Sequence, residues 1–103
     1  MMSTANAAAR MDGKICLVTG ATRGLGLATA VELAKLGAHV VIAGRNAARI
    51  DAALDSIRGH APASSPDSLL ADLSSLRQVR ALAGQFRQRY DELDVLINNA
   101  GGT

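Results

Sequence analysis

Three glycines, Gly20, Gly24 and Gly26, stand between a short apolar run and a segment with helical periodicity, and they constrain the fold more than any other feature. A backbone that turns sharply and closely approaches a bound pyrophosphate has no room for side chains at such positions. The helix that follows would offer free amide groups and the positive end of its dipole to the anion. The spacing therefore predicts a loop that cradles the phosphates of a nicotinamide dinucleotide.

The segments beside the glycines support this interpretation. Residues 15–18 form an apolar run that is typical of a buried parallel strand. Apolar residues then recur with helical spacing through residues 25–36, at Leu25, Ala28, Val31 and Ala34. Gly37 is placed to end this helix, and the β-branched run at residues 39–43 predicts a second strand. Together these segments form one βαβ unit.

The rest of the chain continues the alternation of helix and strand. The pattern predicts a helix at residues 46–58, with Asn46 as its N-cap, and then a loop at 59–67. A strand is predicted at 68–71. A further helix, opened by a capping box at Ser75 and Gln78, leads to a last strand at 94–98. The order βαβαβαβ with right-handed crossovers predicts an α/β fold, the first half of a doubly wound Rossmann domain, with parallel strands in the order 3-2-1-4. We expect the last strand to have an open outer edge and an uncovered sheet face beside it.

Composition restricts the class of protein. The chain has 103 residues, of which 49% are hydrophobic and 19% charged, a globular balance for one domain at most. No apolar run approaches the roughly 20 residues of a membrane span, so no membrane partner is expected. A single cysteine, Cys16, suits a reducing cytoplasm, where we expect the protein to reside. Residues 1–11 are expected to be a disordered tail, followed by one dinucleotide-binding domain at residues 12–103.

The formal charge of +2 and the arginines of the third predicted helix raise the question of nucleic-acid binding. Arg77, Arg80 and Arg87 fall opposite the apolar residues of that helix, and Asp91 and Glu92 follow closely. No aromatic platform accompanies them. This pattern is typical of a solvated helix face, so no nucleic-acid partner is predicted.

Three groups of residues together resemble the amino-terminal, cofactor-binding half of the short-chain dehydrogenase/reductase family. They are residues 19–26, with the sequence Thr-Gly-Ala-Thr-Arg-Gly-Leu-Gly, Asp72 with Leu73 after the third strand, and residues 98–101, with the sequence Asn-Asn-Ala-Gly, after the fourth. The match spans residues 12–102. Residues 44–46 and 72–76 are most similar to the retinol-dehydrogenase-like branch of the family.

The resemblance implies a set of cofactor-binding residues. It implies that the phosphates and the adenosine ribose are lined by Gly20, Thr22, Arg23, Gly24, Leu25 and Gly26, that the adenine is bordered by Asp72 and Leu73, and that the riboses lie above Asn99, Ala100 and Gly101. Thr19 and Asn98 would brace the first strand against the last. For Asp72, a simple turn residue at the strand end remains the alternative.

The choice of cofactor follows from charge. A fold that selects NAD usually carries a carboxylate about 20 residues beyond the glycines, where it accepts hydrogen bonds from the ribose hydroxyls. Residues 38–50 contain no Asp or Glu, and the second strand ends instead in Gly44 and Arg45. Arg45 and Arg23 could clamp a 2′-phosphate, which predicts NADP(H) over NAD(H). The alternative is that both arginines are ordinary surface residues.

The resemblance also implies hydride transfer between a nicotinamide and an alcohol or carbonyl carbon, assisted by a Ser and a Tyr-x-x-x-Lys pair. The only tyrosine, Tyr90, is followed four residues later by Asp94, so the chain lacks this pair and no catalytic residue is predicted in it. We expect a truncated family member, whose substrate pocket and homo-oligomer interface belong to the full-length protein. A non-catalytic module that binds a nucleotide or a partner chain, or a decayed fragment, remains an alternative. No His, Cys and carboxylate cluster has metal-ligand spacing, so no metal is predicted.

Overall fold

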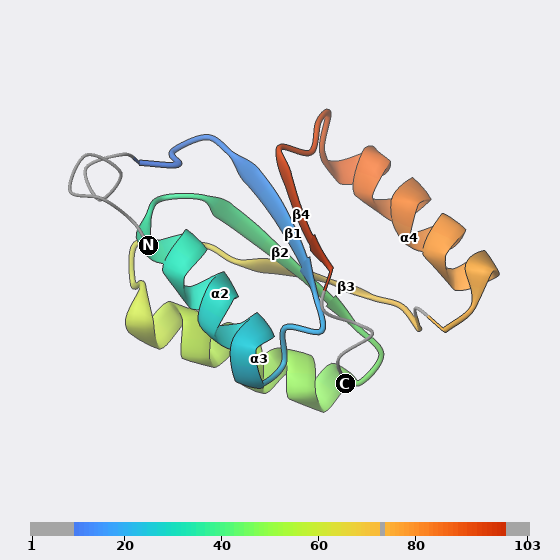
Figure 1. Ribbon diagram of the computed structural model, residues 1–103, viewed down its shortest axis with the longest axis horizontal. Coiled ribbons are helices and arrows are strands. Elements are labelled where there is room, and N and C mark those ends of the chain that lie inside the picture. The colour runs from blue at the N-terminus through green and yellow to red at the C-terminus, as the bar shows by residue number, and fades with distance from the viewer. Residues whose placement is uncertain (1–9, 73, 99–103) are drawn as a thin grey trace.

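A four-stranded parallel sheet forms the centre of the computed structural model, which describes residues 10–72 and 74–98. Its strands are β1 (Ile15–Thr19), β2 (His39–Gly44), β3 (Asp67–Leu70) and β4 (Val95–Asn98), in the order β3-β2-β1-β4 (Figure 1). The predicted fold class and strand order are therefore confirmed. Thr19 pairs with both Ala43 and Asn98, so the carboxyl ends of β2, β1 and β4 lie side by side at one end of the sheet. This end is called the carboxyl edge below.

Three helices connect these strands, α2 (Gly24–Lys35), α3 (Ala47–His60) and α4 (Leu76–Arg89). The predicted boundaries of strands and helices agree with the structure to within two residues. Asn46 caps α3 by accepting a hydrogen bond from the Arg49 amide at 3.0 Å, and the Ser75 hydroxyl accepts one from the Gln78 amide at 3.4 Å. Gly37 follows α2 at φ +95°, a conformation that ends a helix at little cost only for glycine.

The helices cover the two faces of the sheet unequally. Figure 1 shows α2 and α3 on one side and α4 on the other. On the first side, α2 and α3 bury a core around Val18, Ile42 and Ile57. On the second side, α4 contributes Leu82 and Phe86 to a smaller cluster that includes Leu17, Val41 and Leu69.

The buried face of α2 differs from the periodicity proposed above, and the buried face of α4 is narrow. In α2 the buried residues are Gly26, Ala30, Val31 and Ala34, whereas Ala28 is exposed and Leu25 is 76% exposed. The helix is rotated in this way because Gly26, not Leu25, packs against the preceding loop. In α4, Leu76, Val79 and Ala83 are exposed, because α4 lies over β3 and leaves the sheet beside β4 uncovered.

The first described residues, Arg10 and Met11, are held to the fold by polar contacts. The Met11 amide donates to the Leu36 carbonyl at 2.7 Å, and the Arg10 guanidinium pairs with Asp12 at 3.2 Å. In the ranges 10–72 and 74–98, no helix is long and apolar enough to cross a bilayer.

A polar cluster at the amino ends of the strands fastens the end of α4 to the sheet. The Tyr90 hydroxyl donates to the Asp67 carboxylate at 2.7 Å and lies 3.0 Å from His39 Nε2. Arg89 donates to the same carboxylate oxygen at 2.9 Å. Tyr90 also packs on Phe86, with 4.8 Å between ring centroids. Tyr90 is thus a half-buried residue packed on the core, with its hydroxyl held in a polar network.

These contacts shift two pKa values in opposite directions. Burial raises the pKa of Asp67, but hydrogen bonds from Tyr90 and the Ser68 amide, with the charge of Arg89, outweigh burial and hold it below its usual value. Burial is the main cause that raises the pKa of Tyr90 to about 12. The hydrogen bond to Asp67 and the negative charge of that carboxylate raise it further. Both shifts favour the ionised carboxylate beside a neutral phenol.

We expect Asp67→Asn to lower the free energy of unfolding at pH 7 by about 1 kcal/mol, since its side chain is 39% exposed and solvent screens the contacts. Tyr90→Phe should cost about as much. The native contribution is complete above the unfolded-state pKa of about 3.9 and is lost as the pH falls through the lower folded-state pKa. Urea unfolding at pH 7 and below pH 4 checks this, because the difference from wild type should shrink in acid.

Asp55→Asn is the matched control, since Asp55 pairs with Arg58 on the exposed face of α3. Its cost should stay below about 0.5 kcal/mol. Equal costs for the two substitutions would show that the cluster at Asp67 contributes no more than a surface ion pair.

Candidate functional site

The loop between β1 and α2 is built on backbone conformations that only glycine adopts readily. Gly20 has φ +63° and Gly24 has φ +60°, both in the left-handed region. Gly26 lies in the first turn of α2, where a Cβ atom would collide with the carbonyl oxygen of Gly20. The three glycines thus serve different needs, two for the turn and one for the close approach of the helix to the loop.

The amino end of α2 is open, in contrast to those of α3 and α4. Arg23 occupies the N-cap position in an extended conformation and makes no side-chain capping hydrogen bond within the described part of the chain. The first turn of α2 also holds no acidic residue. Asn46 and Ser75, by comparison, close the other two helices with their own side chains. The glycine loop therefore leaves helix amides available to an anion such as a phosphate.

The end of β2 lies beside this loop. A Cβ atom on Gly44 would sit 3.8 Å from the Thr22 methyl group and 3.6 Å from Ile50, which is ordinary van der Waals contact. Arg23 and Arg45, one on each of the two segments, are exposed. Two guanidinium groups thus stand on neighbouring segments at the edge where the strands end.

Asp72 follows the end of β3 and lies at the same end of the sheet. The Ala71 amide donates to the Gly44 carbonyl at 2.7 Å, which carries the pairing of β3 with β2 one residue further. Asp72 Oδ1 accepts hydrogen bonds from the Ser74 amide at 3.0 Å and from the Ser74 hydroxyl at 2.7 Å. These bonds, and then the charge of Arg45, lower the pKa of Asp72, so its carboxylate is ionised.

The charge interaction between Arg45 and Asp72 is not among the features predicted from the sequence. The signal was present, because each follows the end of a strand and the predicted order places the second and third strands side by side. A carboxylate near Arg45 partly offsets the positive charge that the arginine brings to this edge.

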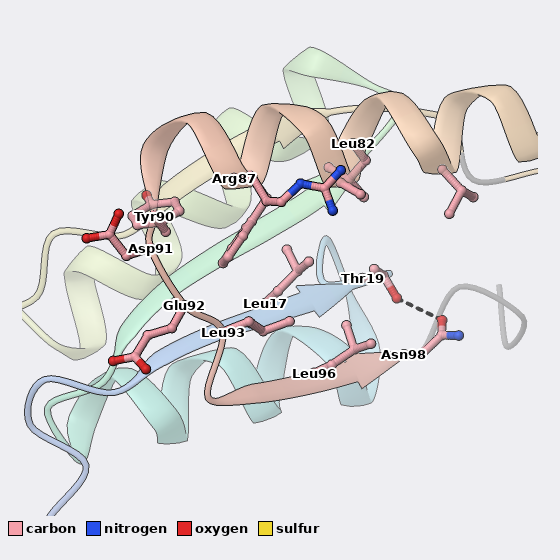
Figure 2. A pocket seen from close by; sticks show the side chains of 13 residues that line it. Leu17, Thr19, Leu82, Arg87, Tyr90, Asp91, Glu92, Leu93, Leu96 and Asn98 are labelled. Carbon is pink, nitrogen blue, oxygen red and sulfur yellow. Dashed lines mark hydrogen bonds between the residues drawn. The ribbon is translucent and has the colours of Figure 1, made fainter.

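Thr19 and Asn98 join β1 to β4 as the resemblance implied. Thr19 Oγ1 donates to Asn98 Oδ1 at 2.9 Å, from one strand end to the next (Figure 2). The structure thus brings together Gly20, Thr22, Arg23, Gly24, Leu25, Gly26, Arg45 and Asp72 at one edge. The remaining predicted site residues, Leu73, Asn99, Ala100 and Gly101, lie outside the described residues.

Tyr90 follows the end of α4 and lies at the amino ends of the strands, opposite the glycine loop. Its raised pKa and its bond to Asp67 make it a poor proton donor or acceptor for chemistry near neutral pH. In the part of the chain that the structure describes, no three His, Cys, Asp or Glu residues are grouped to hold a metal ion.

Comparison with known proteins agrees with this geometry. The sequence model of the family described as short chain dehydrogenase matches residues 14–103. Retinol dehydrogenase 14 of Mus musculus is 45% identical over 101 residues, an alignment that covers 88% of this chain and 30% of that protein.

Two similar solved structures hold a dinucleotide. L-sorbose reductase from Gluconobacter frateurii, complexed with NADPH and L-sorbose, has a TM-score of 0.81 at 31% identity, covering 90% of this chain and 35% of its own. The RhlG/NADP active-site complex of Pseudomonas aeruginosa has a TM-score of 0.81 at 33% identity, covering 88% and 36%. The chain spans about a third of the length of these relatives, and the glycine loop, the strand order and the family match together show that it belongs to the short-chain dehydrogenase family.

Proposed function

We propose that this chain is the cofactor-binding part of an NADP(H)-dependent oxidoreductase that interconverts an alcohol and a carbonyl compound. The observation that carries the proposal is the open amino end of α2 beside a loop of left-handed glycines. The two other described helices that start at this edge are capped by Asn46 and Ser75, so α2 is the one arranged for an external anion. Membership in the family supports a dinucleotide as that ligand.

Each residue of the edge has a separate role in this proposal. Gly20, Gly24 and Gly26 let the backbone approach the pyrophosphate, and the amides of the first turn of α2 bind it. Arg23 and Arg45 bind the 2′-phosphate from two sides, and the Thr22 methyl group lies beside Gly44. Asp72, ionised and oriented by Ser74, faces the adenine end. When bound, the nicotinamide would supply or accept the hydride.

The catalytic group belongs, in this proposal, to polypeptide beyond residue 103. No Tyr-x-x-x-Lys pair is present in the 103 residues, and Tyr90 stands at the wrong edge with a raised pKa. The substrate is a small alcohol or carbonyl compound, and the protein acts in the cytoplasm. The relatives named above support this substrate class, since one is called a retinol dehydrogenase and another an L-sorbose reductase.

The preference for NADP(H) is tested with Arg23→Ala and Arg45→Ala combined, in the polypeptide that the whole reading frame encodes. Each guanidinium at an exposed phosphate contributes about 1 kcal/mol, so the ratio of NADPH to NADH affinity should fall about thirtyfold, with NADH affinity nearly unchanged. Fluorescence titration with both nucleotides measures this ratio. Arg77→Ala, on exposed α4, is the control. An unchanged ratio in the double variant would reduce both arginines to surface residues.

A second prediction concerns Gly44, which stands where NAD-selective sites carry a carboxylate. Its surroundings accommodate a Cβ atom at ordinary van der Waals distances, so we expect Gly44→Asp to fold and to repel the 2′-phosphate. We expect NADPH affinity to fall at least about tenfold relative to NADH. Gly44→Asn is nearly isosteric and uncharged, and it should keep most of the preference. If Asp and Asn act alike, volume rather than charge is responsible.

A third prediction concerns the contact between the loop and α2. In Gly26→Ala the new methyl group meets the Gly20 carbonyl, so the loop must move and both nucleotides should bind at least about tenfold more weakly. Gly84→Ala is the control, since Gly84 lies within α4 and a Cβ there meets nothing within 4 Å. That change should stabilise the protein by about 0.5–1 kcal/mol. Thermal unfolding and nucleotide titration of both variants check these expectations.

A further inference from the structure

The outer edge of β3 runs along the strand and is distinct from the carboxyl edge, where the strands end. Among the described residues, β2 is the one strand beside β3. The Ala71 amide donates to the carbonyl of Gly44, and Gly44 is the register partner of Leu70. Because successive residues of a strand direct their backbone groups to opposite sides, Leu69 and Ala71 bond toward β2. The N–H and C=O groups of Ser68 and Leu70 therefore point to the outer edge.

An outer edge of this kind can pair with another strand. Outward N–H and C=O groups are a template on which a second chain forms a ladder of hydrogen bonds. Leu70 adds an apolar side chain to this edge, since it is 55% exposed. Pro66, directly before β3, has no N–H to offer, and β3 itself has only 4 residues. The outward groups of Ser68 and Leu70 are thus the ones that decide whether pairing occurs.

Side chains bind both outward groups of Ser68. The Ser68 amide donates to Asp67 Oδ1 at 2.8 Å. Arg89 Nη1 donates to the Ser68 carbonyl at 3.1 Å and to Asp67 Oδ2 at 2.9 Å. The ion pair of Asp67 and Arg89 therefore closes over the backbone of Ser68. A neighbouring strand would have to displace both side chains before it could pair at this residue.

The end of α4 holds this ion pair in place. Arg89 is the last residue of α4, and the Tyr90 hydroxyl, next in the chain, donates to Asp67 Oδ2 at 2.7 Å. Arg87 lies in the same last turn and is exposed, but it forms no ion pair within the described part of the chain. Both arginines suit the negative end of the helix dipole equally well. The contact with Ser68 is what distinguishes Arg89.

We propose that Asp67 and Arg89 close the outer edge of β3 to a second copy of this chain. With Ser68 bound by these side chains, Leu70 alone remains for pairing, and one residue is less than the roughly three of the shortest ordinary strands. A second copy is the partner that must be kept out, because every copy carries the same edge. Two such edges could pair with each other about a two-fold axis and leave the rest of both sheets unchanged.

The test removes the ion pair in the polypeptide that the whole reading frame encodes. Asp67→Ala combined with Arg89→Ala frees both outward groups of Ser68 and keeps the net charge. Asp55→Ala combined with Arg58→Ala is the matched control, since it removes an exposed ion pair from α3. Sedimentation velocity over a range of concentrations measures self-association. We expect the first double variant to associate beyond the wild-type state at concentrations at least about tenfold lower than wild type, and the control to match wild type.

Leu70→Pro, added to the first double variant, identifies the surface that associates. Proline removes the outward N–H of residue 70 and leaves the bonds to β2 intact, and it is tolerated on an edge strand. Association should then return to the wild-type level. Leu70→Thr keeps the N–H and removes the apolar side chain, so it should retain most of the association. Association that persists with proline, or that the control shares, would overturn the proposal, because another surface or general instability would then be responsible.

Hydrogen exchange in the wild-type protein tests the same idea without any substitution. The amides of Ser68 and Leu70 both point outward, and that of Ser68 has a side-chain acceptor in Asp67. We expect the Ser68 amide to exchange at least about tenfold more slowly than the Leu70 amide when followed by NMR. Equal exchange rates would contradict the proposal, because Asp67 would then not close the edge at Ser68.

Discussion

The approach of α2 to the carbonyl oxygen of Gly20 is the contact on which the rest of the structure depends. Because Gly26 has no side chain, the helix begins directly against the loop, and this fixes both its rotation and its distance from β1. The rotation buries Ala30, Val31 and Ala34 against the sheet and leaves Leu25 exposed. The same contact aims the open amino end of α2 at the edge where the strands end.

The helices of one βαβαβαβ unit cover the two faces of the sheet to different extents. α2 and α3 lie side by side and enclose Val18, Ile42 and Ile57 almost fully. Among the described elements, α4 is the helix on the other face; it is held at one end by the hydrogen bond of Tyr90 to Asp67, and it buries Leu82 and Phe86. A single helix cannot cover four strands, so the face beside β4, where Leu96 is 57% exposed, stays open.

The sequence predicted the fold, and it predicted which residues the structure brings together where the strands end, because those features are encoded locally. Glycine spacing, the cap residues Asn46 and Ser75, and β-branched runs each act within a few residues, and the crossover rule then orders the strands. The phase of α2 was predicted less well, since Leu25 and Ala28 fit a helical period that the contact of Gly26 overrides. The hydroxyl network of Tyr90, Asp67 and His39 depends on residues far apart in the chain, which periodicity does not register.

The charges at the proposed dinucleotide site are balanced rather than simply basic. Arg45 stands near Asp72, whose carboxylate is kept ionised first by Ser74 and then by Arg45 itself. Because Asp72 is bound to Ser74, it is held at the end of β3 instead of closing onto Arg45 as an ion pair. An arginine neutralised by a direct ion pair would have to break that pair before binding a phosphate. The Ser74 bonds therefore keep Asp72 from pairing directly with Arg45. This leaves the arginine better placed to bind an external anion.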